Sequence, residues 1–254
     1  MTTTEYRAHP GVNFSTLKHI LRSPADYQAA LYSPHKETPA LLFGTLAHSS
    51  ILEGKAVIEI ATSKPPGLNL ATKEGKEWKA GQTLPIIDTE AVLALRGMHE
   101  AVEANPHARH VLSQCQDRET PILGSLRGVE CKALLDAHGT DGVDWCIVDL
   151  KTTDDASPDA FARSVAKYHY DMQAAFYSQL LAQVHQIETR PYWLWLAVQK
   201  TAPYTCAVYS ANEWIAGGDD KVETALDRLK ECRESGQWPQ PYGGITELPK
   251  PRYA

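Results

Sequence analysis

Apolar residues follow a helical period in some parts of the chain and form short continuous runs in others. Spacing of three to four between apolar positions predicts helices over residues 12–32, 40–53, 88–111, 158–185 and 214–232. Pro24 interrupts the first of these helices. Residues 54–86 combine short strand-like pieces with prolines and a glycine, so this segment is expected to be an irregular excursion.

Short apolar runs bounded by turn residues predict strands instead. These runs cover residues 120–126, 129–135, 143–150, 192–198 and 205–208. Arg127-Gly128 and residues 138–142 separate the first three, which predicts a three-stranded meander. The expected fold is therefore a single α/β domain over residues 1–254, with helices before and after a central mixed β-sheet.

The composition fits a globular chain with a sizeable core. The chain has 254 residues, of which 43% are hydrophobic and 22% are charged. No apolar stretch reaches the roughly 18 residues that would indicate a membrane span, and Met1 to Glu5 lacks the pattern of a signal peptide. The 5 cysteines include no CxxC pair, which argues against a disulfide framework or a zinc site. A cytoplasmic protein without membrane contact is expected.

The net charge of −6 does not by itself indicate a nucleic-acid-binding protein. Contact with DNA then needs a local basic face, and Lys73, Lys76 and Lys79 are the candidates for it. Their spacing of three places them along one side of a helix. The alternative is an ordinary solvated helix face, on which Glu74 and Glu77 act as partners of the lysines.

The most informative short motif is Asp149-Leu150-Lys151 at the end of an apolar run. Alternation along a strand puts Asp149 and Lys151 on one face, and Asp136 ends another apolar stretch thirteen positions upstream. Carboxylates bind hard divalent cations and a lysine holds and activates water, as metal-dependent phosphodiester hydrolysis requires. The alternative is a salt bridge at the sheet edge, worth only ~0–1 kcal/mol if exposed. The polar residues 152–155 favour an open cleft.

Two further pairs lie one helical turn apart. Gly44 and His48 form the first pair, in which Gly44 is expected to let the backbone pack closely beside the face that carries His48. Gln173 and Tyr177 form the second, after Tyr168, His169 and Tyr170. These aromatic and polar groups are suited to contacting phosphates or stacking on bases. The alternatives are a satisfied core histidine, a buried tyrosine and a capping glutamine.

Taken in order, GxxxH, Asp, Asp-x-Lys and QxxxY resemble the PD-(D/E)XK nuclease superfamily. Within it the chain resembles the RecB-like branch, and most closely the nuclease domain of RecE, or exonuclease VIII. The segments that carry this resemblance are Tyr6, Pro10-Gly11-Val12, Ser15-Thr16-Leu17, Ser23-Pro24-Ala25-Asp26-Tyr27, Phe43-Gly44-Thr45-Leu46-Ala47-His48, Asp149-Leu150-Lys151-Thr152-Thr153, Tyr170-Asp171-Met172-Gln173-Ala174-Ala175-Phe176-Tyr177, Trp238 and Leu248-Pro249. The resemblance implies a restriction-endonuclease-like core.

The resemblance also implies a role for each site residue. The expected metal ligands for Mg²⁺ or Mn²⁺ are His48, Asp136, Asp149 and the carbonyl of Leu150. The expected catalytic residues are Lys151, Asp149, Asp136, Gln173, Tyr177 and Glu119. Lys151 would position the attacking water, and Glu119 lies where relatives often have a further acidic residue. Candidate DNA-binding residues are Lys73, Lys76, Lys79, Tyr168 and His169.

The activity implied is a metal-dependent exonuclease that degrades linear double-stranded DNA, with 5′-to-3′ polarity, in phage or prophage recombination. The resemblance further implies a single-strand annealing protein as partner and a homo-oligomeric ring. An imidazole ligand is favourable for Mn²⁺, so Mn²⁺ is expected to support cleavage. Two alternatives stay open: a structure-specific endonuclease on the same core, and a DNA-binding or assembly module that does not cleave. The number of metal ions also stays open.

Overall fold

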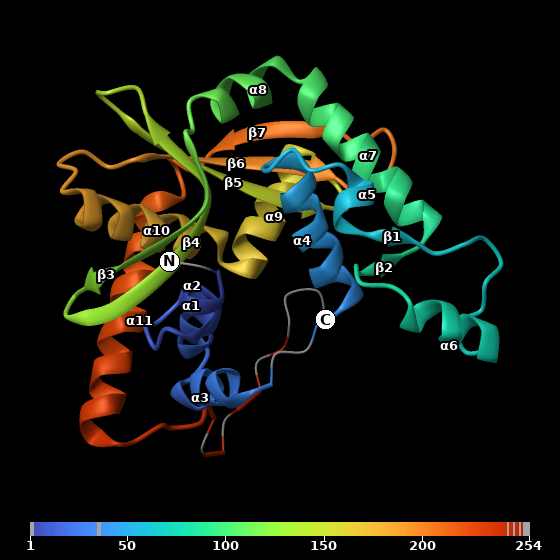
Figure 1. Ribbon diagram of the computed structural model, residues 1–254. Helices are drawn as coiled ribbons and strands as arrows, with labels where there is room; N and C mark the ends of the chain where they lie inside the picture. The colour runs from blue at the N-terminus through green and yellow to red at the C-terminus, as the bar shows by residue number, and fades with distance from the viewer. Residues whose placement is uncertain (1–2, 35–36, 243, 246, 249, 251–254) are drawn as a thin grey trace.

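A computed structural model describes residues 3–34, 37–242, 244–245, 247–248 and 250. Its centre is a five-stranded sheet in the order β3-β4-β5-β6-β7 (Figure 1). The strands are β3 (Asp117–Leu126), β4 (Val129–Thr140), β5 (Trp145–Thr153), β6 (Tyr192–Gln199) and β7 (Cys206–Ser210). Strands β5 and β6 pair in parallel, and the other neighbours pair antiparallel. The predicted meander, mixed sheet and α/β class are confirmed.

Helices cover both faces of this sheet. One face carries α9 (Pro158–Tyr168), α10 (Tyr170–His185) and α11 (Ile215–Ser235), together with the N-terminal helices. The other carries α4 (Pro39–Ile51), α7 (Thr89–Ala104) and α8 (Pro106–Ser113). Neighbouring strand residues enter opposite cores, as Ile147 and Val148 show. Strand β5 is thus covered on both sides, which explains its nearly continuous apolar sequence.

The helix predicted over residues 12–32 is wrong as a single element. The chain forms α2 (Phe14–Leu17), a short 3-10 helix (Lys18–Leu21) and α3 (Pro24–Tyr32), after α1 (Thr3–Ala8). Ser23 caps α3 by accepting a hydrogen bond from the Asp26 amide, and Pro24 occupies the first turn. Proline disfavours a helical conformation at the residue before it, so the helix ends here and a new one begins.

Two other predicted helices are also divided. The segment 88–111 splits into α7 and α8 where the Asn105 side chain caps α8 ahead of Pro106. The segment 158–185 splits into α9 and α10 at His169, which adopts a left-handed conformation with φ of 58°. No proline or glycine marks this second break. It changes the direction of the chain between Tyr168 and Tyr170.

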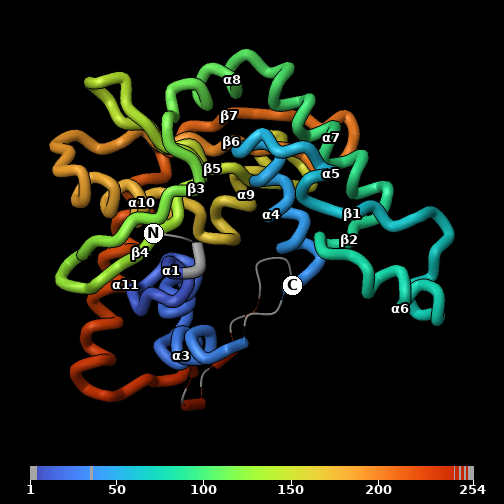
Figure 2. The backbone as a smooth tube through the Cα atoms, viewed as in Figure 1, coloured from blue at the N-terminus to red at the C-terminus, as the bar shows by residue number. Residues whose placement is uncertain are grey.

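Residues 54–86 form the irregular excursion that was expected, now with defined elements. They contain α5 (Val57–Ile60), β1 (Thr62–Ser63) and α6 (Lys73–Ala80), and they end in β2 (Ile86–Ile87), which reaches one residue further and pairs with β1 in parallel. Figure 2 shows this excursion extending away from the central sheet, with α6 at its outer end. The lysines of α6 are therefore placed at the periphery of the molecule.

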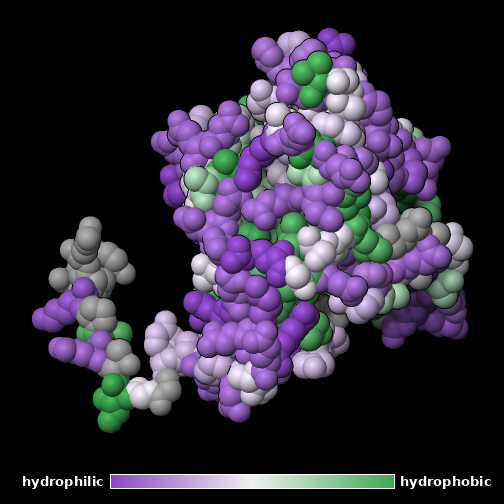
Figure 3. Space-filling view, turned by 90° about the vertical axis from the view of Figure 1, so that its left-hand side faces the viewer, coloured by the Kyte–Doolittle hydropathy of each residue, from purple (hydrophilic) through white to green (hydrophobic). Residues whose placement is uncertain are grey.

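The C-terminal segment returns to the N-terminal helices. Trp238 stacks on Tyr27, with ring centroids 5.8 Å apart, and the Ala25 amide donates a hydrogen bond to the Pro239 carbonyl. Leu248 is exposed, and Pro249, part of the ending that resembles the RecE family, lies outside the described residues. Figure 3 shows a mainly hydrophilic face, with hydrophobic residues in its recesses. Among the described helices, none has the length and apolar character needed to cross a bilayer.

Candidate metal-dependent active site

The predicted site residues converge on one cavity of about 670 Å³. Residues of helix α4, strands β3 to β5 and helix α10 line it, together with Phe14 and Ser15 of α2. The predicted residues that line it are His48, Glu119, Asp136, Leu150, Lys151, Gln173 and Tyr177. Asp149 lies just beneath them with 2% of its surface exposed. Residues separated by more than a hundred positions in sequence thus share one chemical environment.

His48, Glu119 and Asp136 form a close group of possible metal ligands. Their candidate ligand atoms all lie within 4.8 Å of one another. His48 Nδ1 is 3.2 Å from Glu119 Oε1 and 3.6 Å from Asp136 Oδ1. Burial lowers the pKa of His48, but Asp136 and Glu119 outweigh this effect and raise it to about 9. The two carboxylates therefore favour positive charge in the site, and their oxygens, with the His48 imidazole once it has lost its proton, fit Mg²⁺ or Mn²⁺.

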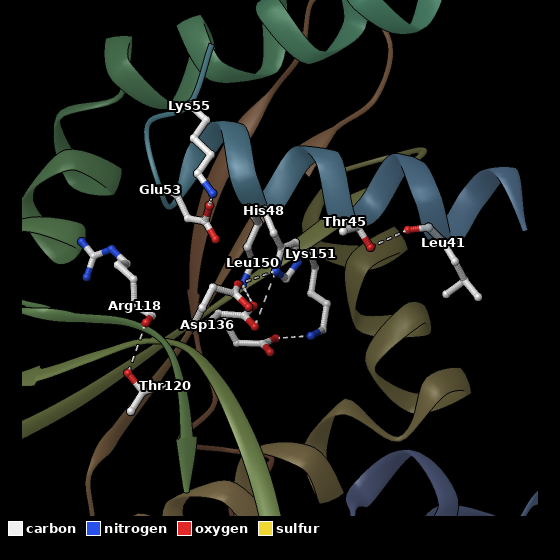
Figure 4. Close-up of polar contacts among 12 residues, drawn as sticks. Leu41, Thr45, His48, Glu53, Lys55, Arg118, Thr120, Asp136, Leu150 and Lys151 are labelled. Atoms are coloured by element: carbon white, nitrogen blue, oxygen red, sulfur yellow. Dashed lines mark hydrogen bonds and ion pairs between the residues drawn. The ribbon is translucent and has the colours of Figure 1, made fainter. Parts of the chain in front are cut away.

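Local structure explains how His48 reaches the carboxylates. The Thr38 side chain caps α4 by accepting from the Leu41 amide, and Pro39 begins the helix. Leu46 and Ala47 are buried against the sheet and orient the helix. His48 then projects from α4 toward Asp136, as Figure 4 shows.

Asp136, on β4, is held by a hydrogen bond from the neighbouring strand β5. Its Oδ2 accepts a hydrogen bond of 2.8 Å from the Leu150 amide, which leaves Oδ1 facing His48. A carboxylate fixed in this way loses little further freedom when it binds a cation. Coordination by the Leu150 carbonyl stays a prediction.

Asp149 and Lys151 form an ion pair between Asp149 Oδ2 and Lys151 Nζ. The pair is buried, with 3% and 14% of the respective side chains exposed, so it differs from the exposed edge pair considered as an alternative. Burial raises the pKa of Asp149, whereas the Lys151 ammonium opposes that shift. Taking two charges out of water is costly, so such a pair is weak evidence for stability and points to another role. Lys151 Nζ already pairs with Asp149 Oδ2, so metal coordination by Asp149 stays a prediction.

Helix α10 supplies the second pair of predicted residues. Gln173 Nε2 donates a 3.0 Å hydrogen bond to Asp149 Oδ1, so this glutamine orients the buried carboxylate. Tyr177 lies one turn further and is 7% exposed, and burial raises the pKa of its hydroxyl well above the usual value. A protonated tyrosine hydroxyl at the cavity wall can donate to an anionic substrate.

Glu119 reaches the site through a distortion in β3. Its φ is 46°, in the left-handed region. The ladder pairs Arg118 with Ala137 and Thr120 with Leu135, so Glu119 and Asp136 both drop out of it. A non-glycine residue in this conformation costs of order 1–3 kcal/mol and is found preferentially at functional sites. The sequence carries no signal for this distortion. The distortion explains how the Glu119 side chain reaches His48.

This strain gives a first testable prediction. Because only glycine adopts positive φ without penalty, Glu119→Gly is expected to be more stable than Glu119→Ala by about 1 kcal/mol. Urea unfolding of both variants measures the difference. The matched control is Glu130, an exposed strand residue paired with Ser125. There alanine is expected to be the more stable replacement, because glycine weakens an ordinary strand. The same order of stability at both positions would contradict strain at Glu119.

Some sequence-based candidates lie away from the site. Lys73, Lys76 and Lys79 do lie on α6, as expected, but none lines the cavity. Lys73 is 91% exposed in its side chain and lies 3.9 Å from Glu77, as the alternative interpretation expected. Their contact with DNA stays a prediction. Tyr168 lines a neighbouring cavity, whereas His169 lines neither that cavity nor the main one.

Gly44 requires a correction. A Cβ added at this position would meet no atom within 4 Å, so the close backbone packing expected beside His48 is wrong. Gly44 instead lines the cavity, together with Thr45 and Ser49 of the same helix. Tyr170, one of the aromatic residues expected to contact phosphates or bases, also lines it, and Lys151 Nζ lies 4.7 Å from its ring centroid.

Comparisons with known proteins agree with this fold. The "Putative exonuclease" of Eubacterium rectale superposes with a TM-score of 0.68 at 14% sequence identity, covering 99% of this chain and 96% of that one. A second structure, SSO0001, reaches a TM-score of only 0.28 at 12% identity, covering 74% of this chain and 87% of that one. No curated protein matches. The model of the "PDDEXK-like domain of unknown function (DUF3799)" matches residues 13–249. The chain therefore belongs to this family of PDDEXK-like domains.

Proposed function

We propose that this protein is a divalent-cation-dependent nuclease that hydrolyses phosphodiester bonds of linear double-stranded DNA from an end. One observation carries the proposal. The candidate ligand atoms of His48, Glu119 and Asp136 lie within 4.8 Å of one another in a cavity that Lys151, of the buried Asp149–Lys151 pair, also lines. Membership of a PDDEXK-like family supports it. The single nuclease domain predicted over residues 1–254 and the cytoplasmic location belong to the same proposal.

His48, Glu119 and Asp136 are the proposed ligands of Mg²⁺ or Mn²⁺, with Asp149 and the Leu150 carbonyl as further candidates. When bound, such a cation polarises the phosphoryl oxygen and makes water a stronger nucleophile near neutral pH. The donor set includes an imidazole, which is more favourable for Mn²⁺ than for Mg²⁺.

The protein's own groups have distinct tasks in this proposal. Lys151 donates hydrogen bonds to the attacking water and to the negative charge that develops on the phosphate. Asp149 keeps that ammonium in place, and Gln173 keeps Asp149 in place through its 3.0 Å hydrogen bond. Tyr170 covers the lysine from one side, because Nζ lies 4.7 Å from its ring centroid. Tyr177 and Gln173 shape the wall along which the DNA strand runs.

The finer assignment follows from the resemblance to the RecE branch. It comprises 5′-to-3′ polarity, a role in phage or prophage recombination, a single-strand annealing protein as partner and a homo-oligomeric ring around the DNA. Each of these belongs to the proposal and extends beyond the geometry of the site.

The deciding experiment is time-resolved digestion of linear duplex DNA labelled at one end, with Mn²⁺ and then Mg²⁺ added to metal-stripped protein. An exonuclease of 5′-to-3′ polarity releases a 5′ label early and a 3′ label late, and it leaves closed circular duplex intact. Nicking or linearisation of the circle would favour the structure-specific endonuclease. Binding without cleavage in either metal would favour the non-cleaving assembly module.

A further inference from the structure

A second cavity adjoins the first and is not used by the proposed chemistry. It measures about 330 Å³ and shares Ala40, Lys151, Thr152 and Tyr170 with the main cavity. It lies where the parallel strands β5 and β6 end, between α4 and α9. The carboxyl ends of parallel strands are a common place for ligands in open α/β sheets. The two cavities together form one trough that passes Lys151.

The lining of the second cavity combines aromatic and cationic groups. Phe43 and Tyr168 contribute rings from α4 and α9, and 43% of Tyr168 is exposed. Lys200 contributes an ammonium from the end of β6. Its Nζ is 2.7 Å from Asp154 Oδ1, but that carboxylate side chain is 91% exposed. Such an exposed pair contributes little, so Lys200 can exchange this partner for a phosphate.

The trough carries cationic and aromatic groups, the two kinds of side chain that contact the phosphates and the bases of a nucleic-acid strand. From the main cavity outward come the Lys151 ammonium, the Tyr170 ring 4.7 Å from it, and the Tyr168 ring. The two tyrosine ring centroids are 5.6 Å apart. Lys167 Nζ lies 5.1 Å from the Tyr168 ring, which makes that ring a cation-bearing stacking surface. Aromatic rings bind bases, and cations bind phosphates, in proteins that hold single strands.

We propose that the second cavity binds the nucleotide next to the scissile phosphate, with its base against Tyr168 and its outer phosphate at Lys200. This proposal rests on the proposed function and adds to it the conformation of the DNA end that the enzyme binds. A cavity of about 330 Å³ is at the small end of ligand pockets, which suits one nucleotide. A base that stacks on the Tyr168 ring has left its place in the duplex, so the nucleotide bound there is unpaired and the enzyme acts on a locally opened DNA end.

The test compares cleavage of linear duplexes whose last two base pairs are matched, mismatched or replaced by abasic sites on the cleaved strand. On mismatched ends, Tyr168→Ala is expected to raise KM about 10-fold, the effect of losing one stacked base, with little change in kcat. Tyr168→Phe is expected to restore the wild-type KM, because it keeps the ring. The control variant is Tyr192→Ala, an exposed tyrosine at the start of β6. On abasic ends, wild type and Tyr168→Ala are expected to have equal KM values.

Lys200→Ala gives an independent readout. It is expected to raise KM on all three ends and to reduce the salt dependence of binding by about one charge, as the loss of one phosphate contact does. Lys230→Ala on α11 serves as the control, because Lys230 pairs with Asp227 and lines neither cavity.

The outcomes separate the two proposals. If the wild type cleaves nothing, the proposed function fails. If the wild type cleaves but Tyr168→Ala leaves KM unchanged on mismatched ends, or raises it equally on abasic ends, the nucleotide-binding role of the second cavity is overturned and the nuclease assignment stands. Equal KM values of the wild type on matched and mismatched ends would overturn the need for an unpaired nucleotide.

Discussion

Lys151→Ala is expected to lower the rate of DNA cleavage by at least about 100-fold while the protein still binds DNA. In the proposed mechanism the removed ammonium donates to the water and to the developing negative charge, and losing one such preorganised donor typically costs about 10²–10³ in kcat. Binding depends instead on many contacts along the strand, so the dissociation constant is expected to change by only a few fold. The measurement is single-turnover cleavage beside fluorescence anisotropy with the same duplex.

The variant is expected to fold, for a reason visible in the site. Asp149 loses its counter-ion, but burial already raises the pKa of this carboxyl, so it takes up a proton instead of remaining an unpaired buried charge. Lys151→Met keeps most of the side-chain volume and serves as a second variant, and Lys230→Ala controls for the loss of a surface lysine. If Lys151→Ala cleaves as fast as the wild type, the assignment of Lys151 is wrong. Weaker binding together with unchanged kcat would indicate an anchoring role only.

Asp136→Asn is expected to weaken the binding of Mn²⁺ by at least about 10-fold and to reduce cleavage by about 100-fold or more. Asparagine has the same shape, and its side-chain oxygen can still accept the hydrogen bond from the Leu150 amide. The change therefore removes mainly the negative charge beside His48 and Glu119. Even groups that only orient metal ligands affect affinity 10–100-fold, so a direct ligand is expected to have at least that effect.

Two measurements check this independently of activity. Calorimetric titration of metal-stripped protein with Mn²⁺ gives the affinity directly. Thermal unfolding gives it through linkage, because a cation at about 100 times its dissociation constant stabilises the wild type by about 2.7 kcal/mol. At the same Mn²⁺ concentration, a loss of affinity of about 10-fold or more is expected to reduce this gain to about 1.4 kcal/mol or less in the variant. Asp144→Asn, in the exposed turn before β5, is the matched control. An unchanged Mn²⁺ affinity in Asp136→Asn would place the cation elsewhere.

The sheet was predictable from the sequence because strands β3 to β5 and β6 to β7 are apolar runs bounded by turn residues. The ends of elements were less predictable. Strand β4 continues to Thr140, past the expected turn, because His138 is buried and paired with Ile147 instead of exposed in a loop. The break between α9 and α10 gives no composition signal, since it contains no proline or glycine and His169 takes the left-handed conformation, which is uncommon for non-glycine residues.

The candidate site was predictable as a set of residue types at ordered spacings. His48, Asp136, Lys151, Gln173 and Tyr177 do meet in one cavity. The spacings along the sequence do not show which atoms face one another. The structure pairs Asp149 with Lys151 and groups Glu119, expected as catalytic, with His48 and Asp136 instead.

The sequence by itself determined the chemistry that is possible here: carboxylates, an imidazole and a lysine, placed on elements whose apolar patterns make them strands and helices. Only the tertiary structure decided how these groups are arranged. The backbone of Glu119 takes a left-handed conformation where it leaves the ladder with β4, and the trough beyond Lys151 lies between α4 and α9 at the ends of β5 and β6. Side-chain types and local periods are properties of short segments. Contacts between distant segments depend on the packing of the whole core.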